Sequence, residues 1–197
     1  IQKYGFDPSA KKFIKNYKNN TKLICDFFNY ESIKKLRLEN KVKLVTSFAM
    51  FYDLQNPINF AKNIKKTLKQ DGVWCLEQSY LPLMIKTNAF DTICHEHLEY
   101  YSLKQIEYIM SMAGLKVFDV SLNKANGGSF KCIVCRKDSN YKIKNSVLKL
   151  RLYEKKFFSD KNIYKKFVQR VKKINQDLLI TITKFLKQGK KVYIIGA

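Results

Sequence analysis

The chain has 197 residues, with 38 lysine and arginine residues against 16 acidic ones, which gives a formal net charge of +22. Hydrophobic residues make up 46% of it, a share that excludes a disordered basic tail and indicates a globular protein. The length predicts one domain, or one domain and a piece of another. Only four of the 38 cationic residues are arginine, whose planar side chain suits phosphates and bases. We therefore expect lysine-rich solvated faces rather than a nucleic-acid partner.

The sequence contains no signal peptide and no apolar run of about 20 residues that could span a bilayer. Its five cysteines form an odd set, which favours a reducing compartment. We predict a cytoplasmic protein without membrane contact. The chain starts at Ile1 and ends at Ala197, directly after the apolar run 192–195, and we expect it to be a segment of something longer.

Short β-type runs alternate with amphipathic helical stretches at the start of the chain. The predicted strands are 5–7, 23–25, 42–48 and 73–77, and the predicted helices are 8–17, 31–39 and 57–69. Asp71-Gly72 is predicted to separate the last helix from the strand after it. Strands separated by helices of this length predict right-handed crossovers and a parallel sheet with helices on both faces.

The next elements predict a different ending for this sheet. A helix over 103–113 is closed by Gly114, and strands over 115–120 and 129–135 follow, joined across Asn126-Gly127-Gly128. Two strands joined without a helix should form an antiparallel pair at the sheet edge. A parallel sheet finished by a hairpin is the outline of the Rossmann-like methyltransferases, an α/β fold.

From about Asn145 the character of the chain changes. Apolar residues recur at spacings of three and four from Tyr164 to Phe185, which places them on one stripe of a long helix. Ser159-Asp160 is a start signal for this helix and Gly189 a stop signal. Such a stripe is typical of a packing surface, with the lysines on the wet face. Residues 190–197 are predicted to form the first strand of a second α/β domain.

The densest cluster of reactive side chains lies between Phe90 and Ser102. It holds both histidines of the chain, His95 and His97, on either side of Glu96. Histidine can take a proton near neutral pH, and a neighbouring glutamate can hold the ring. The cluster follows a predicted strand, and clefts of open α/β sheets lie beyond the carboxyl ends of strands. General acid/base work is the favoured interpretation; a metal site that adds Cys94 or Glu96 and a structural loop stay open as alternatives.

Two further patterns, the cysteine pair and the glycines, say little about function. Cys132-Ile133-Val134-Cys135 lies inside a β-type run and has no second pair, so we interpret its cysteines as small apolar residues. The seven glycines form no GxGxxG and no Walker pattern. We assign no metal site to either pattern.

Leu76 to Leu81, Phe90 to Ser102 and Asn126 to Ser129 together resemble the SAM-dependent sugar C-methyltransferases, which act on nucleotide-linked keto-sugars. The resemblance extends over residues 1–197, and its most specific part is the His-Glu-His-X-X-Tyr-X-Ser segment. Members of that family have an N-terminal zinc-binding domain, a central SAM domain and a C-terminal Rossmann-like domain. The resemblance therefore implies zinc only outside this chain.

The same resemblance implies a domain organisation and a fold class. Residues 1–140 would form a Rossmann-like class I methyltransferase sheet with a terminal antiparallel hairpin, lacking its first strand and glycine-rich loop. Residues 141–189 would be a helical linker, and 190–197 the first strand of a C-terminal Rossmann-like domain. We expect the isolated segment to be inactive.

In the chemistry that the resemblance implies, a base removes a proton next to the ketone and the enolate carbon attacks the methyl group of SAM. His97 is the predicted base, with Glu96 and His95 orienting it or binding the sugar. Tyr100 is predicted to donate a hydrogen bond to the developing enolate oxygen, a role that Tyr101 or Tyr80 could also take while binding the substrate.

The resemblance also implies where SAM binds. Asp7 would accept hydrogen bonds from the ribose hydroxyls, Asp26 and Phe27 would lie near the adenine, and Ser47 would lie near the methyl donor. The alternative for Asp7 is a helix N-cap before Pro8.

The predicted function is thus SAM-dependent C-methylation of a nucleotide-activated keto-sugar, as in deoxysugar biosynthesis. Two alternatives stay open. The protein could methylate another small acceptor, with His97 deprotonating a hydroxyl. It could instead be a basic interaction module whose 145–189 helix binds anionic polymers.

Overall fold

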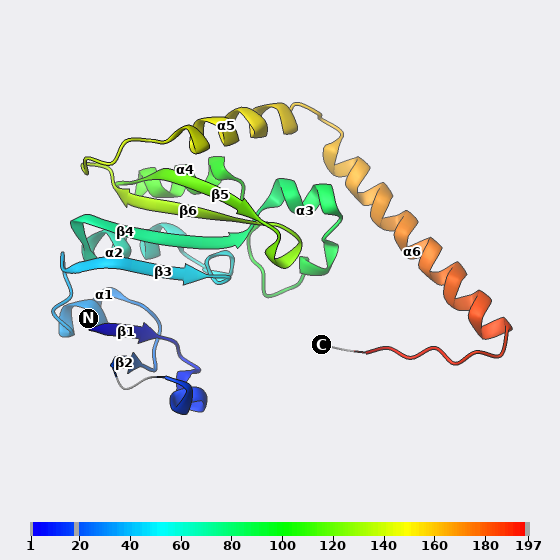
Figure 1. The fold of residues 1–197 in the computed structure, drawn as a ribbon, viewed down its shortest axis with the longest axis horizontal. Helices are drawn as coiled ribbons and strands as arrows, with labels where there is room; N and C mark the ends of the chain where they lie inside the picture. Colours follow the sequence, from blue (N-terminus) through cyan, green and yellow to red (C-terminus); the bar gives the residue numbers. More distant parts are fainter. Residues whose placement is uncertain (1, 18–19, 196–197) are drawn as a thin grey trace.

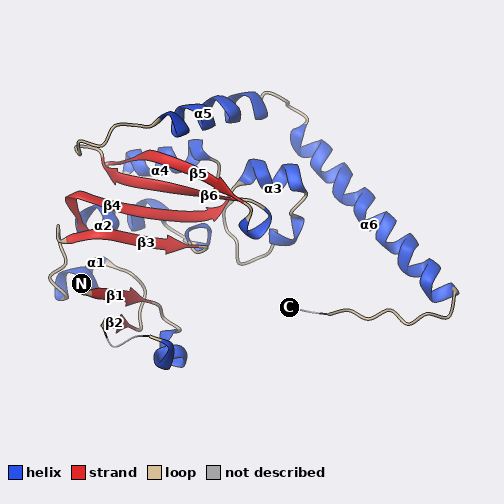
Figure 2. Cartoon of the chain, in the orientation of Figure 1, coloured by secondary structure: helices blue, strands red, loops and turns tan. Residues whose placement is uncertain are grey.

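The computed structural model describes residues 2–17 and 20–195, and in this part the chain forms an α/β structure (Figure 1). The elements, with η for a 3-10 helix, are β1 (Lys3–Phe6), η1 (Ala10–Asn16), β2 (Thr21–Ile24), α1 (Tyr30–Lys35), β3 (Val42–Phe48), η2 (Phe51–Asp53), α2 (Pro57–Thr67), β4 (Leu68–Ser79), α3 (Leu81–Thr87), η3 (Phe90–Thr92), α4 (Leu103–Met112), β5 (Leu115–Asn123), η4 (Ala125–Gly127), β6 (Ser129–Arg136), α5 (Asn145–Phe157) and α6 (Ile163–Lys187). Figure 2 shows how helices and strands alternate along the chain.

Two sheets are present in the described residues. β1 pairs with β2 in parallel, and a four-stranded sheet has the order β3-β4-β6-β5. β3 is parallel to β4, whereas β6 is antiparallel to both β4 and β5. The predicted terminal hairpin is therefore confirmed, with β5 at the edge of the sheet. The turn of this hairpin requires glycine, because Gly127 and Gly128 have positive φ angles of 75° and 126°.

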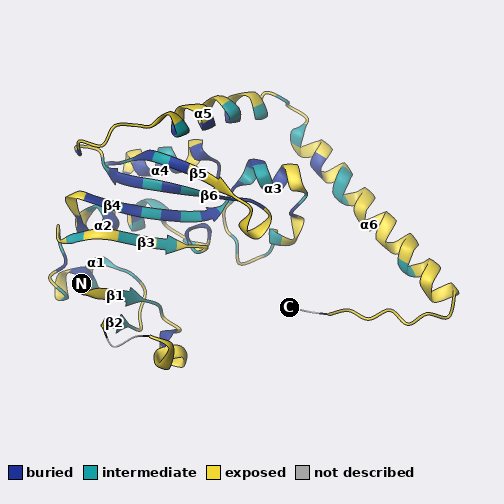
Figure 3. Cartoon of the chain, in the orientation of Figure 1, coloured by how far each residue is buried: buried dark blue, intermediate teal, exposed yellow. Residues whose placement is uncertain are grey.

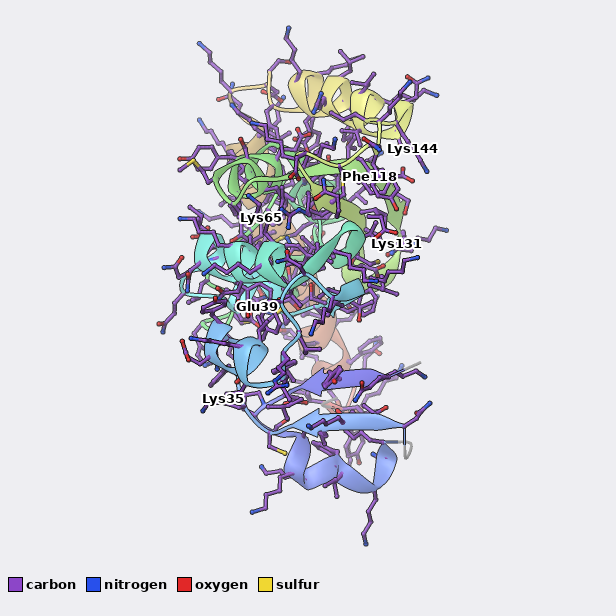
Figure 4. The ribbon with its side chains drawn as sticks, turned by 90° about the vertical axis from the view of Figure 1, so that its left-hand side faces the viewer. Lys35, Glu39, Lys65, Phe118, Lys131 and Lys144 are labelled. Atoms are coloured by element: carbon purple, nitrogen blue, oxygen red, sulfur yellow. The ribbon has the colours of Figure 1, made fainter. Side chains whose placement is uncertain are left out.

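The expectation of helices on both faces is wrong for the four-stranded sheet. Both α2 and α4 pack on one face, and Leu44 and Phe48 on the other are 57% and 55% exposed. Figure 4 shows Lys65 of α2 and Lys131 of β6 on opposite sides of the sheet. The chain moves from β3 to β4 and on to β5 in one direction across the sheet. Right-handed crossovers in one direction place their helices on the same face.

The boundary between α2 and β4 also differs from the prediction. α2 ends at Thr67 and β4 begins at once with Leu68, so Asp71-Gly72 lies inside the strand. The pairing with β3 shifts from Val42–Leu68 to Leu44–Val73, so three extra residues bulge out of β4. A Cβ on Gly72 would lie 2.7 Å from the Val42 carbonyl oxygen, which explains glycine at this bulge.

The core lies between the sheet and its helices, where Figure 3 shows the buried stripes of β4, β5 and β6. Trp74 and Leu76 of β4 are almost fully buried, as is Ile106 of α4. The ring centroid of Phe51 lies 5.6 Å from those of both Trp74 and Tyr101. This aromatic cluster ties the end of β3 to the segment before α4.

The region after residue 144 forms two helices, α5 and α6. α5 packs along β5 and α4, whereas most of α6 is exposed (Figure 3). Arg170 anchors the start of α6 to α3 by donating to Asn88 Oδ1 and to the Ile85 carbonyl oxygen, both at 2.7 Å. No helix among the described residues is long and apolar enough to cross a membrane.

The predicted strand at 190–197 is not formed in its described part. Lys190–Ile195 is exposed chain without regular structure, and residues 196–197 lie outside the described residues. An apolar run becomes a strand only when a neighbouring strand accepts its backbone hydrogen bonds, and none lies beside it among the described residues.

Candidate active site

The candidate site lies at the carboxyl ends of β3 and β4, toward which both arrows point in Figure 1. Ser79 closes β4, and η2 follows β3 directly. The backbone of Glu99 donates to the Tyr52 carbonyl oxygen at 3.2 Å and so joins the His-Glu-His segment to η2. A narrow pocket forms between them, lined by Tyr52, Ser79, Leu81, Met84, Thr92, His97, Glu99, Tyr100 and Tyr101.

His97 is the histidine that faces this pocket. Its Nδ1 lies 2.7 Å from the Thr92 carbonyl oxygen, and its ring centroid lies 4.2 Å from that of Tyr52. The Tyr100 hydroxyl donates to the same carbonyl oxygen at 3.4 Å. Because a carbonyl oxygen can only accept, Nδ1 must carry a hydrogen, and in the neutral ring the lone pair is on Nε2. His97 is thus held in the tautomer that can take up a proton at Nε2.

Two residues of η2 complete the surroundings of His97. The Tyr52 ring packs against the imidazole at a tilt of 52°, and Asp53 lies close enough to interact electrostatically with it. Partial burial raises the pKa of the Asp53 carboxyl, and the charge of His97 opposes that rise. The sequence analysis did not single out either residue. Both follow β3, and clefts of open α/β sheets lie beyond the carboxyl ends of strands, so this position could have identified them.

His95 and Glu96 lie outside the pocket. Their side chains are 92% and 75% exposed, and His95 Nε2 lies 4.0 Å from Glu96 Oε1. Among the described residues neither side chain hydrogen-bonds His97, and the Thr92 carbonyl orients the ring instead. The structure therefore does not place His95 and Glu96, which were predicted to orient the base, in contact with His97.

The two candidate substrate tyrosines have opposite surroundings. Tyr101 is 4% exposed and lines the pocket, and its hydroxyl has no hydrogen-bond partner among the described residues. Tyr80 is completely buried, and its hydroxyl donates to Glu154 Oε1 at 2.8 Å. The prediction of Tyr80 as a substrate-binding residue is thus wrong, because its polar group is already paired inside the fold. Burial raises the pKa of Tyr101, so its phenol stays protonated and can donate.

The predicted cofactor residues follow β1 and β2 or close β3. Asp7 Oδ1 accepts from the backbone N–H and the hydroxyl of Ser9, both at 2.8 Å, while Oδ2 has no donor among the described residues; the N-cap of η1 is Ser9, not Asp7 as the alternative expected. Asp26 Oδ1 accepts from the Phe27 N–H at 2.7 Å, and the Phe27 ring is 72% exposed. Ser47 Oγ accepts from Trp74 Nε1 at 2.8 Å. An acidic oxygen and an aromatic face at adjacent strand ends fit a ribose and an adenine.

The cysteine pair of β6 is split by the sheet. Cys132 is paired with Leu76 and Cys135 with Val73 of β4, so their side chains point to opposite faces. Both are buried and free, and burial raises the pKa of each thiol. This geometry cannot place the two sulfurs on one metal ion.

Comparison with known structures defines the class of fold. A protein from Sulfolobus solfataricus described as a type 11 methyltransferase superposes with a TM-score of 0.53 at 16% identity, over 71% of this chain and 73% of its own. LepI in its complex with SAM superposes with a TM-score of 0.53 at 11% identity, over 68% of this chain and 36% of LepI. The chain therefore has the Rossmann-like class I methyltransferase fold, as predicted.

Comparison of sequences adds the family. Residues 2–120 match the family described as "Methyltransferase domain", and the chain belongs to this family. Residues 124–197 match the "C-methyltransferase C-terminal domain". The C-methyltransferase NovU of Streptomyces niveus is 26% identical over 151 residues, which cover 76% of this chain and 35% of NovU. The chain thus spans about a third of that relative's length. The resemblance seen in the sequence is confirmed.

Proposed function

We propose that the protein is a SAM-dependent C-methyltransferase that acts on a nucleotide-activated keto-sugar. The observation that carries the proposal is that His97, held through Nδ1 with the ring's lone pair on Nε2, lines the same pocket as buried Tyr101, whose hydroxyl has no partner among the described residues. A base and a neutral hydrogen-bond donor are the two groups that enolate formation needs. The similarity to NovU, named as a C-methyltransferase, supports the same reaction class.

The residues of this chain have separate roles in the proposed reaction. His97 Nε2 takes the proton from the carbon next to the ketone, and the positive charge that forms on the ring is close to Asp53. Tyr101 donates to the enolate oxygen as negative charge develops there. Tyr100 shares the Thr92 carbonyl with His97 and helps to fix the ring. Glu96 and His95 contribute from the exposed rim, where a polar sugar can reach them.

SAM fits the strand ends described above and supplies the methyl group when bound. Asp7 would hold the ribose through Oδ2, Asp26 and Phe27 would hold the adenine, and Ser47 would lie toward the methyl donor. The solved complex of LepI with SAM, which shares this fold, supports the cofactor. Residues 1–140 would act as the methyltransferase domain, with 141–189 as the linker that follows it.

The decisive experiment uses the protein in its natural full length with methyl-labelled SAM and a dTDP-4-keto-deoxysugar. We expect label on the carbon next to the ketone, and exchange of that carbon's proton in D₂O without SAM. His97→Ala should lower both rates by about 10² or more. His95→Ala, two residues away on the exposed rim, should lose far less. Undiminished proton exchange in His97→Ala would refute the assigned base, and label on an oxygen would refute C-methylation.

A further inference from the structure

Glu154 is a buried acidic side chain that no step of the proposed reaction uses. It belongs to α5, is 5% exposed, and lies 50 to 74 residues along the chain from its partners. A buried carboxylate is costly unless hydrogen bonds compensate it. The identity of those donors therefore shows what the residue does.

Three donors from two elements of the site meet at this carboxylate. Oε1 accepts from the Tyr80 hydroxyl at 2.8 Å and from the Leu103 N–H at 2.6 Å, and Oε2 accepts from the Lys104 N–H at 3.1 Å. Leu103 and Lys104 are the first two residues of α4, whose N–H groups have no partner inside the helix. The positive end of the α4 dipole stabilises the negative charge further.

These donors flank the candidate active site directly. Tyr80 follows Ser79, which lines the pocket, and Leu103 comes two residues after Tyr101. The Leu81 N–H donates to the Tyr101 carbonyl oxygen at 2.9 Å, so the end of β4 and the segment before α4 are joined twice. The other end of the segment before α4 is held by the hydrogen bond from the Glu99 N–H to the Tyr52 carbonyl oxygen. The stretch that carries Tyr100 and Tyr101 is thus clamped at both ends.

The geometry points to Glu154 as a positioning residue that sets the placement of Tyr101 and His97 in the site. The expected effect of Glu154 on the reaction rate rests on the proposed function. Its expected effect on the position of Tyr101 and His97 does not. α5 lies in the part of the chain that matches the C-methyltransferase C-terminal domain, whereas the site lies in the part that matches the methyltransferase domain. Glu154 therefore links the geometry of the site to the helices that follow the sheet.

The test compares Glu154→Gln with Glu107→Gln as a matched control. Glu107 of α4 pairs with Arg151 of α5 at 2.6 Å, so it joins the same two helices through a more exposed bond. We expect Glu154→Gln to speed amide exchange at Leu103 and Lys104 about tenfold or more. It should also shift the ring NMR signal of His97 and leave that of exposed His95 in place. Glu107→Gln should change none of these.

Catalysis provides the second readout. In the full-length enzyme, Glu154→Gln should lower kcat about 10- to 100-fold at temperatures where the fold is intact, with a much smaller change in KM. If Glu154→Gln does not fold, Glu154→Asp keeps the charge, withdraws the carboxylate by one methylene and should give the same shifts. An unmoved His97 signal in a folded Glu154 variant, or an unchanged kcat, would overturn the inference. If the wild-type enzyme transfers no methyl group, the proposed function fails, and the exchange and NMR results still decide the positioning.

Discussion

Tyr80 and Tyr101 are both buried, yet removal of their hydroxyl groups should have opposite effects on stability. The Tyr101 hydroxyl is unpaired among the described residues, and a buried polar group without a partner costs about 1–3 kcal/mol. Tyr101→Phe removes that cost and keeps the ring against Phe51. The free energy of unfolding should therefore rise by about 1 kcal/mol, which raises Tm by about 2–4 °C in a chain of this size.

Tyr80→Phe removes a real hydrogen bond to a carboxylate. Such a bond contributes about 1.5–3 kcal/mol, so Tm should fall by about 3–12 °C. Glu154 keeps its two backbone donors in this variant. Chemical and thermal denaturation of the wild type and both variants, measured in parallel without ligands, provides the comparison.

Activity should separate the two variants in another way. If Tyr101 donates to the enolate oxygen, Tyr101→Phe should lower kcat by about 10² despite the more stable fold. A gain in stability that accompanies a loss of activity is typical of a residue kept for function. Loss of stability in Tyr101→Phe would show that its hydroxyl has a partner in the protein, and the reasoning would be refuted.

Two further predictions concern the fold. Gly72→Ala should destabilise the protein by about 1–3 kcal/mol, because the added Cβ would press on the Val42 carbonyl oxygen. Thermal denaturation measures this, and an unchanged Tm would contradict the close approach of the β4 bulge to Val42. Partial burial acts to raise the pKa of Asp119, but hydrogen bonds from Lys144 and Ser146 lower it overall. Because the pKa of Asp119 is lower in the folded state than in the unfolded state, its ionised carboxylate stabilises the fold at any pH above the pKa of the unfolded state. This contribution is lost as the pH falls through the pKa of the folded state. Between pH 6 and 3 the wild type should therefore lose more stability than Asp119→Asn, and equal losses in urea titrations would count against the pairing.

Local patterns in the sequence determined much of the fold. The β-type run 42–48 predicted β3 with its observed bounds, and Gly114 marked the end of α4. Asn126-Gly127-Gly128 predicted the hairpin because its backbone angles favour these residue types. Each of these signals acts within a few residues. A strand also needs a neighbouring strand, so residues 190–195 have no regular structure here, and the further domain that 190–197 would begin stays a prediction.

Only the tertiary structure decided which reactive groups work together. The family resemblance favoured His97 over His95 as the base, but only the structure shows that His97 contacts the Thr92 carbonyl and packs at a tilt against Tyr52. Tyr80 and Tyr101 look interchangeable until Glu154 is found to pair with one of them. These partners come from segments that are distant in the chain, and packing brings them together. The sequence by itself therefore determined the sheet, the hairpin and the reactive segment, whereas non-local packing determined which side chains face the pocket and which support it.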